Sequence, residues 1–347
     1  MVYNIADILS EPEIQANKKL IDEIIINFLP SNHGIKEIDL LYNMMRDYPL
    51  RPAKGIRSSI CLFTSQAFGG IIDDALLTAS SLELFQNWIL IHDDIEDESE
   101  LRRGQPVLHR KYTIPLAINA GDSLHGRMWS LLQKNHSLLG TELTLDIINE
   151  FIHMLNETTE GQHMELSWSK NNDLNISQED YLVMCTKKTS WYTCITPFRL
   201  GNLIAEKKNI NKNKFVEFGT NLGIAFQIRD DILNLTANSK YGKEHAGDII
   251  EGKRTLILIH LLESCNTSDR EFIESFFNNN REFRESNSKK LLDLISKYKS
   301  IDYATNICNE FSDKALNEFD IIFSDLPDTR SRLLLNNITK YMVSRNW

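Results

Sequence analysis

The sequence predicts an all-α protein that folds as one large helical body. Glycine (15) and proline (8) are scarce among the 347 residues, below the roughly 7% and 5% of ordinary proteins. No proline falls between Pro115 and Pro197 or between Pro197 and Pro327, so long helices are permitted. Apolar residues recur at helical spacing, and no segment alternates as a β-strand would. At roughly 150 residues per domain the length suggests two domains, but no linker divides the chain, and we expect a single domain over residues 1–347.

Turn-forming residues divide the chain into helical stretches. Clusters of Gly, Pro, Asn and Ser occupy residues 31–34, 48–54, 170–175 and 236–242, and such clusters punctuate helices. Two further segments, 206–214 and 266–290, are strongly polar. We expect these two segments to be exposed loops or loop-like insertions.

An apolar stripe in the stretch after residue 54 ends in carboxylates. Apolar residues at positions 82, 85 and 89 have the spacing of one helix face, which predicts a helix that packs on the core. Four residues after Ile89 the same face reaches Asp93, and Asp97 follows one turn later with Asp94 beside Asp93. The helix face that is apolar up to Ile89 therefore carries acidic residues from Asp93 onward.

The same pattern occurs a second time. Apolar residues at positions 215, 218, 222 and 226 form the stripe, and Asp230 follows Phe226 by four residues with Asp231 next to it. Like charges on an inward face repel one another and lose hydration. A solvated helix end would explain one such cluster, but two clusters in register with apolar stripes favour sites in which divalent cations neutralise the acids. An all-oxygen set suits Mg²⁺, which shares its shell with substrate phosphates.

Basic residues accompany both acidic clusters. They are Arg102 and Arg103, Lys54 and Arg57, Lys187 and Lys188, and the lysines of 243–253. Each pair alone is typical of a solvated surface. Together with metal-binding acids, they are what a polyphosphate ester requires.

Composition excludes several other classes. The net charge of −10 disfavours a general nucleic-acid binder. No run of about 20 apolar residues occurs, so no membrane span is expected. The N-terminus lacks the features of a signal or transit peptide, which favours a cytoplasmic protein. The five cysteines form no CxxC pair, which argues against a disulfide framework or a zinc ribbon.

With these motifs, the chain resembles the trans-type isoprenyl diphosphate synthases, or polyprenyl synthetases. Residues 93–97 (DDIED) with 101–104 (LRRG) resemble the first aspartate-rich motif of that family, and residues 226–231 (FQIRDD) resemble the second. Residues 54–57 (KGIR) resemble the Gly-Lys-x-x-Arg region, although Ala53 stands where Gly is common. The resemblance covers residues 54 to about 253. It implies one antiparallel helical bundle around a deep central cavity, the isoprenoid synthase fold, usually as a homodimer.

The resemblance also implies a role for each matching residue. Three Mg²⁺ ions would be held by Asp93, Asp97 and Asp230, supported by Asp94 and Asp231. The allylic diphosphate would be gripped by Arg102, Lys188 and Lys243. The diphosphate of isopentenyl diphosphate would be bound by Lys54, Arg57, Arg103 and Gln86. Thr189 and Gln227 would face the developing allylic cation, Phe226 would pack on the isopentenyl unit, and Asp248 with Lys253 would order the loop that closes the site.

Two positions bear on ligands and on product length. Asn234 stands where many family members have a third aspartate, so its part in metal binding is in doubt. In the family, a bulky residue five positions before the first aspartate limits chain length. Here that residue is Trp88, followed by Ile89, which points to a C20 or C15 product. As a plain core residue, Trp88 would equally need no explanation.

The reaction implied is elongation of an allylic diphosphate of five to fifteen carbons by isopentenyl diphosphate. It needs no catalytic histidine, and we expect His92 and His163 to be structural.

Three alternative functions remain. A class I terpene synthase would need a second metal-binding motif, which residues 172–177 miss by one position. A di-iron bundle would need two Glu-x-x-His units, and only residues 160–163 supply one. A catalytically silent partner subunit would not need intact acids in both motifs.

Overall fold

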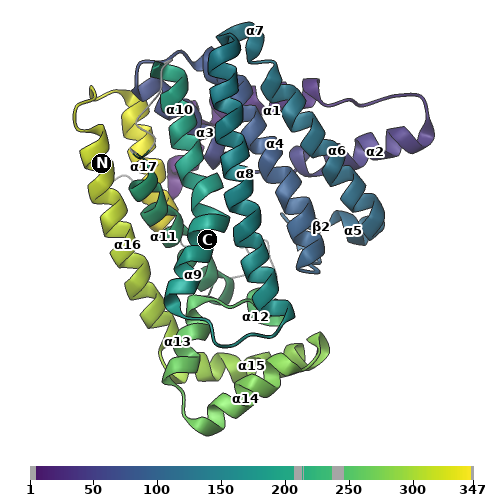
Figure 1. The fold of residues 1–347 in the computed structure, drawn as a ribbon, viewed down its shortest axis with the longest axis vertical. Coiled ribbons are helices and arrows are strands. Elements are labelled where there is room, and N and C mark those ends of the chain that lie inside the picture. Colours follow the sequence, from purple (N-terminus) through teal and green to yellow (C-terminus); the bar gives the residue numbers. More distant parts are fainter. Residues whose placement is uncertain (1–4, 207–212, 214, 237–245, 345–347) are drawn as a thin grey trace.

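The computed structural model describes residues 5–206, 213, 215–236 and 246–344. Long helices run side by side with their axes close to parallel, and the N- and C-terminal helices α1 and α17 both belong to this bundle (Figure 1). The prediction of an all-α protein is confirmed. Within the described ranges, the strands are two residues long and pair as a single antiparallel hairpin.

The elements follow one another as a 3₁₀ turn, η1 (Ile5–Ser10), then α1 (Pro12–Phe28), α2 (Lys36–Leu50), α3 (Ile56–Ala67), α4 (Ile72–Glu96), β1 (Leu101–Arg102), β2 (Gln105–Pro106), α5 (Leu108–Lys111), α6 (Ile114–Gln133), α7 (His136–Leu139), α8 (Thr141–Lys170), α9 (Gln178–Cys185), the π-helix η2 (Thr186–Ile195), α10 (Thr196–Glu206), α11 (Val216–Thr236), α12 (Gly247–Glu251), α13 (Leu256–Ser264), α14 (Thr267–Asn278), α15 (Arg281–Lys297), α16 (Ser300–Phe323) and α17 (Arg330–Ser344).

The two helices that carry the acidic clusters are those that the apolar stripes predict. Helix α4 is 25 residues long and contains neither Gly nor Pro, so its hydrogen-bond ladder runs unbroken to Glu96. Helix α11 is 21 residues long and ends at Thr236. Asp93 lies in the last turn of α4, and Asp230 lies six residues before the end of α11, so both sets of acids stand in the C-terminal parts of their helices.

The core consists of two hydrophobic clusters. One lies among α10, α11, α13, α16 and α17 and contains stacked and edge-on phenylalanines such as Phe198, Phe218 and Phe319. The other lies among α1, α2, α4, α6 and α8, with Phe85 and Phe151 among its members. Residues from both clusters line one cavity, so the functional site lies between the two cores.

The prediction of loops over residues 266–290 is wrong, because α14 and most of α15 cover this segment. Asn266 and Asn280 cap the two helices through their side chains. The buried side is narrow, with Ile273, Phe276 and Phe277 on α14, and the two helices form the end of the molecule below α12 and α13 (Figure 1). A short apolar stripe among charged residues was too weak a signal for a helix.

The remaining turn predictions fit within a few residues. Helix α2 continues through Pro49 to Leu50, three residues into the predicted break at 48–54, and the 170–175 turn begins where α8 ends. Of residues 206–214, Glu206 ends α10, and most of the others lie outside the described residues, as do 237–242. No helix in the described ranges combines the length and the apolarity that a membrane crossing needs.

Candidate active site

A cavity of about 760 Å³ opens between α3, α4, α8, η2 and α11. Among its lining residues are the predicted Lys54, Arg57, Gln86, Trp88, Ile89, Asp93, Arg102, Arg103, Lys188, Thr189, Phe226, Gln227, Asp230, Asp231 and Lys253. Asp94 and Asp97 do not line it, and the predicted Lys243 lies outside the described residues. Residues more than 170 positions apart in sequence thus converge on one space.

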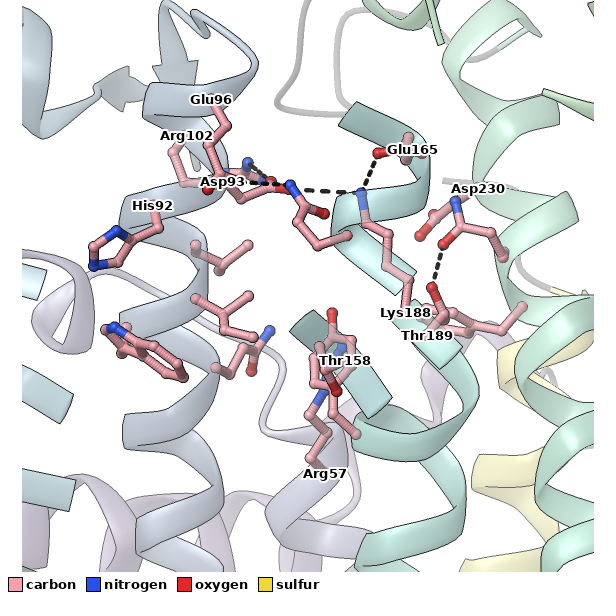
Figure 2. A pocket seen from close by; sticks show the side chains of 18 of the residues that line it. Arg57, His92, Asp93, Glu96, Arg102, Thr158, Glu165, Lys188, Thr189 and Asp230 are labelled. Atoms are coloured by element: carbon pink, nitrogen blue, oxygen red, sulfur yellow. Dashed lines mark hydrogen bonds and ion pairs between the residues drawn. The ribbon is translucent and has the colours of Figure 1, made fainter. Parts of the chain in front are cut away.

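Asp93 and Asp230 stand on facing helices, with Lys188 between them (Figure 2). Lys188 Nζ lies 3.7 Å from Asp93 Oδ1 and pairs with Glu165, while Arg102 Nη2 lies 3.2 Å from Asp93 Oδ2. Burial opposes the charge of Lys188, but Glu165 and Asp93 outweigh burial and raise its pKa. The lysine therefore stays charged between the acids.

Asp94 points away from the cavity. It accepts hydrogen bonds from the Tyr48 hydroxyl on α2 (2.5 Å) and from Arg102 Nε (2.9 Å), and its side chain is fully buried. Burial and the neighbouring Asp94 raise the pKa of Tyr48, so the hydroxyl keeps its proton and donates. Asp94 fixes the guanidinium of Arg102 at the rim of the cavity.

Asp231 has a closely similar environment on α11. The Tyr181 hydroxyl donates to Asp231 Oδ2 at 2.7 Å, and Gln227 Nε2 donates to Oδ1 at 2.8 Å. Burial raises the pKa of Asp231 to about 8, with Asp248 adding to the effect. In both motifs the second aspartate is therefore held by a buried tyrosine from another helix.

Asp97 caps the C-terminal end of α4 at the edge of the cavity. Its carboxylate lies 2.8 Å from Lys253 Nζ, and Lys253 also lies 3.0 Å from Glu251 and 3.7 Å from Asp248. Burial raises the pKa of Asp97 to about 7. The predicted pairing of Asp248 with Lys253 is thus present at this distance, and it includes Asp97 as well.

The Asn234 amide oxygen accepts from the backbone N–H of Asp248 at 3.2 Å, and the Asn234 carbonyl accepts from Ala246 N at 2.9 Å. These bonds join the end of α11 to the start of α12. In this arrangement Asn234 orients the α11–α12 connection.

A second group of cations lies deeper in the cavity. Arg57 Nη2 donates to Thr193 Oγ1 at 2.8 Å, and the guanidinium stacks 4.2 Å from the Tyr192 ring centroid. In the amide orientation that satisfies both of its neighbours, Gln86 accepts from Arg57 Nη1 at 2.9 Å. Lys54 Nζ donates to the Tyr341 hydroxyl at 2.9 Å.

The Arg-Arg-Gly tail forms the hairpin β1–β2, which the sequence did not predict. Arg103 and Gly104 have positive φ (52° and 73°), which closes the tight turn. Arg51 is buried beneath it and donates to the carbonyls of Arg102 (2.8 Å) and Pro106 (2.7 Å). The hairpin therefore directs Arg102 toward Asp93 and Arg103 into the cavity.

A comparison with protein families matches residues 38–295 to the polyprenyl synthetase model. The chain belongs to the polyprenyl synthetase family. It is 35% identical to the geranylgeranyl diphosphate synthase of Sulfolobus acidocaldarius over 79% of this chain and 82% of that protein. It is 30% identical to the geranylgeranyl pyrophosphate synthase of Geoglobus acetivorans over 96% and 98% of the two chains.

Solved structures agree with this assignment. This polyprenyl synthetase superimposes on the geranylgeranyl pyrophosphate synthetase of Pyrococcus horikoshii with a TM-score of 0.84, 31% identity and coverage of 98% and 99% of the two chains. The resemblance inferred from the motifs is confirmed.

Sequence reasoning missed two polar residues on α8. Gln162 donates to Asp93 (3.3 Å) and to Glu96 (2.7 Å), and Glu165 pairs with Lys188. With Thr158 these residues follow spacing i, i+4 and i+7, and all three line the cavity of the polyprenyl synthetase. A polar stripe on a long amphipathic helix was the signal that could have found them.

His92 and His163 also line the cavity. Burial lowers the pKa of His92, which keeps the ring neutral, and His92 Nε2 lies 3.5 Å from Asp122. His163 Nε2 lies 3.3 Å from Ser167 Oγ. Neither ring is bonded to the acids or the cations described above.

Proposed function

We propose that this polyprenyl synthetase condenses isopentenyl diphosphate with an allylic diphosphate of five to fifteen carbons and forms a trans C20 or C15 prenyl diphosphate. The observation that carries the proposal is the cavity itself, in which Asp93 of α4 and Asp230 of α11 stand on facing helices and basic residues line the same space. Relatives at 30–35% identity named geranylgeranyl diphosphate synthase support prenyl elongation.

The donor set fits Mg²⁺. Asp93 and Asp230 on the cavity walls, with Asp97 at its edge beside Lys253, would supply carboxylate oxygens. Within the described ranges, no three His, Cys, Asp or Glu side chains are gathered closely enough to hold a metal ion by themselves. Such a set is completed by substrate phosphates and water, which is how Mg²⁺ is usually held. When bound, three Mg²⁺ ions would supply the positive charge that withdraws electrons from the allylic diphosphate. Asp94 and Asp231 would support these ligands from behind.

The basic residues of the cavity form two groups, one for each diphosphate. Arg102 and Lys188 would hold the allylic diphosphate beside Asp93, and Lys243 is assigned to the same group by resemblance. Lys54, Arg57, Arg103 and Gln86 would hold isopentenyl diphosphate. The two substrates then meet in front of Thr189, Phe226 and Gln227, which the cavity brings together.

The bond changes follow from this placement. The allylic C–O bond breaks, and its electron pair leaves with the diphosphate. The double bond of isopentenyl diphosphate attacks the allylic cation, and transfer of a proton from the resulting cation to the departed diphosphate leaves a product five carbons longer. Thr189 donates to the Gln227 amide oxygen at 2.6 Å, which leaves the lone pairs of the Thr189 hydroxyl to stabilise the cation. A cavity that closes around the substrates would keep water away from the cation.

Product length is assigned to Trp88 and Ile89, which line the cavity before Asp93. The Trp88 indole is stacked on the His125 ring (centroids 4.0 Å apart, planes at 8°) and packs edge-on against Phe85 (5.4 Å). With an edge-on contact to His92 (5.9 Å), three aromatic contacts hold this side chain, and they support its assignment as the floor of the tail channel.

We also propose a homodimer. Helix α8 exposes Leu145 (54%) and Ile152 (43%), which are seven residues apart and therefore share one face. Helix α6 exposes Leu116 (43%) and Ile118 (39%). Large apolar side chains in such positions are typical of subunit interfaces.

The alternatives are less well supported. A terpene synthase has no use for the second set of cations at Lys54, Arg57 and Arg103. In the hypothetical di-iron unit, Glu160 is 61% exposed and pairs with Lys187, away from the cavity. A silent subunit would not retain acids on both cavity walls.

Incubation of the purified protein with Mg²⁺, isopentenyl diphosphate and C5, C10 or C15 allylic primers tests the proposal. We expect elongation, with chromatography of the dephosphorylated products giving the chain length. A cyclic hydrocarbon from a primer alone would favour the terpene synthase, and no elongation with any primer would overturn the proposal.

A further inference from the structure

The π-helix η2 carries Lys188 and Thr189 between the two acid-bearing walls of the cavity (Figure 2). Residues in a π-helix have an irregular hydrogen-bond ladder, and such segments occur at functional sites. Its neighbours therefore have to fix its place. Helix α8 lies on one side of η2 and helix α11 on the other.

Each neighbouring helix meets η2 with a glycine. A Cβ on Gly161 of α8 would collide with the backbone of η2, because it would overlap Lys188 N and lie 2.7 Å from Lys188 Cα and 2.8 Å from the Lys187 carbonyl carbon. A Cβ on Gly223 of α11 would overlap Ser190 Cα and Oγ and lie 2.6 Å from Ser190 Cβ. At both positions the contacts include backbone atoms of η2, so a change of side-chain rotamer cannot relieve them.

Glycine is a poor helix former, and its presence inside α8 and α11 needs a reason. Neither glycine has a positive φ, so backbone freedom is not that reason. Gly126 in α6 is different, because nothing lies within 4 Å of a Cβ built on it. The close approach of η2 is what excludes a side chain at 161 and 223.

One turn beyond each glycine, a polar side chain binds the same π-helix. Glu165, four residues after Gly161, pairs with Lys188. Gln227, four residues after Gly223, accepts from Thr189 Oγ1 at 2.6 Å. Residues four apart share a helix face. On each side of η2, one helix face therefore supplies both a glycine against which η2 packs and a polar side chain that binds a residue of η2.

We propose that Gly161 and Gly223 are positioning residues that seat η2 at the depth where Lys188 and Thr189 face the allylic substrate. The inference rests on the proposed function, because the substrate is assigned there. A methyl group at either position displaces η2. Of the residues assigned to isopentenyl diphosphate, Lys54 and Arg103 lie outside η2, in the segment before α3 and in the β1–β2 turn, and are displaced less. Arg57 contacts Tyr192 and Thr193 of η2, so the isopentenyl site is affected in part.

The test compares Gly161→Ala and Gly223→Ala with the matched control Gly126→Ala. For each, kcat and the KM of both substrates are measured, with thermal melting as a check of folding. We expect kcat/KM for the allylic diphosphate to fall at least tenfold in the first two variants, while the KM for isopentenyl diphosphate rises by a clearly smaller factor than the KM for the allylic diphosphate. The control should match the wild type.

Wild-type constants in both folded variants would overturn the inference, as would an equal rise of both KM values, which indicates general damage. An inactive wild type would instead overturn the proposed function. If Gly223→Ala does not fold, Gly161→Ala decides the test by the same constants. If neither variant folds, Glu165→Gln and Gln227→Ala replace them, because they weaken the side-chain contacts to Lys188 and Thr189 of η2 without adding a Cβ beside its backbone; wild-type constants in both of these variants would overturn the inference.

Discussion

At the scale of single residues, two adjacent acids in one motif have separate tasks. Asp93 lines the cavity, whereas Asp94 is buried against Tyr48 and Arg102. In α11, Asp230 and Asp231 both line the cavity, and Asp231 is bonded to Tyr181 and Gln227. A buried acid without such partners would be costly. The tyrosines allow each motif to carry two acids while only part of the charge faces the substrate.

Trp88 carries a prediction on product length. Trp88→Ala removes the indole that lines the cavity and leaves room for the growing tail, so we expect products at least one isoprene unit longer. Trp168 is a matched control, because it packs on the other core cluster and does not line the cavity. Chromatography of the products compares the variants. An unchanged product distribution in Trp88→Ala would contradict the assignment of Trp88 as the floor.

At the scale of elements, short segments are held by a few buried polar groups. Arg254 is 3% exposed and ties three segments together. Its guanidinium donates to the carbonyls of Asp173 (2.7 Å) and Gly252 and to the Asn172 amide oxygen (2.7 Å), and it lies 5.0 Å from the Phe277 ring centroid on α14. Helix α12, the turn after α8, and α14 therefore share one anchor beside Lys253.

Arg254→Lys keeps the charge but cannot supply three donors in a planar fork. Since at least one buried acceptor loses its partner, we expect the free energy of unfolding to fall by about 1–3 kcal/mol, together with a lower kcat because Lys253 is adjacent. Urea denaturation and steady-state kinetics measure both effects. Arg270→Lys, at an exposed pair with Glu274, should cost less than about 0.5 kcal/mol. Equal losses in the two variants would contradict the anchor.

At the scale of the whole molecule, the cavity exists because two hydrophobic cores leave a space between them. Helices α4 and α8 line that space on one side, and η2 and α11 on the other. The exposed apolar residues of α6 and α8 lie outside it and are free to meet a second copy. In the proposed dimer, α8 would present one face to the cavity and another to the second copy.

The double variant Leu145→Asp/Ile152→Asp places two charges on the proposed interface of α8. We expect light scattering to give the mass of a dimer for the wild type and of a monomer for the variant. Ile321→Asp is the control, because Ile321 is 73% exposed on α16, and its mass should equal that of the wild type. A dimeric double variant or a monomeric wild type would count against this interface.

The sequence alone determined the helical class, the two acidic motifs and the family, because these depend on local spacing: apolar stripes at 82–89 and 215–226 continue into acids on the same helix face. Where the apolar stripe was short, as in α14 and α15, the sequence did not predict the helix. Only the tertiary structure decided that Asp94 turns away from the cavity and that Asp94 and Asp231 are bonded to tyrosines, since Tyr48 and Tyr181 lie 46 and 50 residues away in sequence. It also revealed Glu165, Gln162 and the glycines beside η2, because contacts between helices are set by packing, which no local pattern encodes.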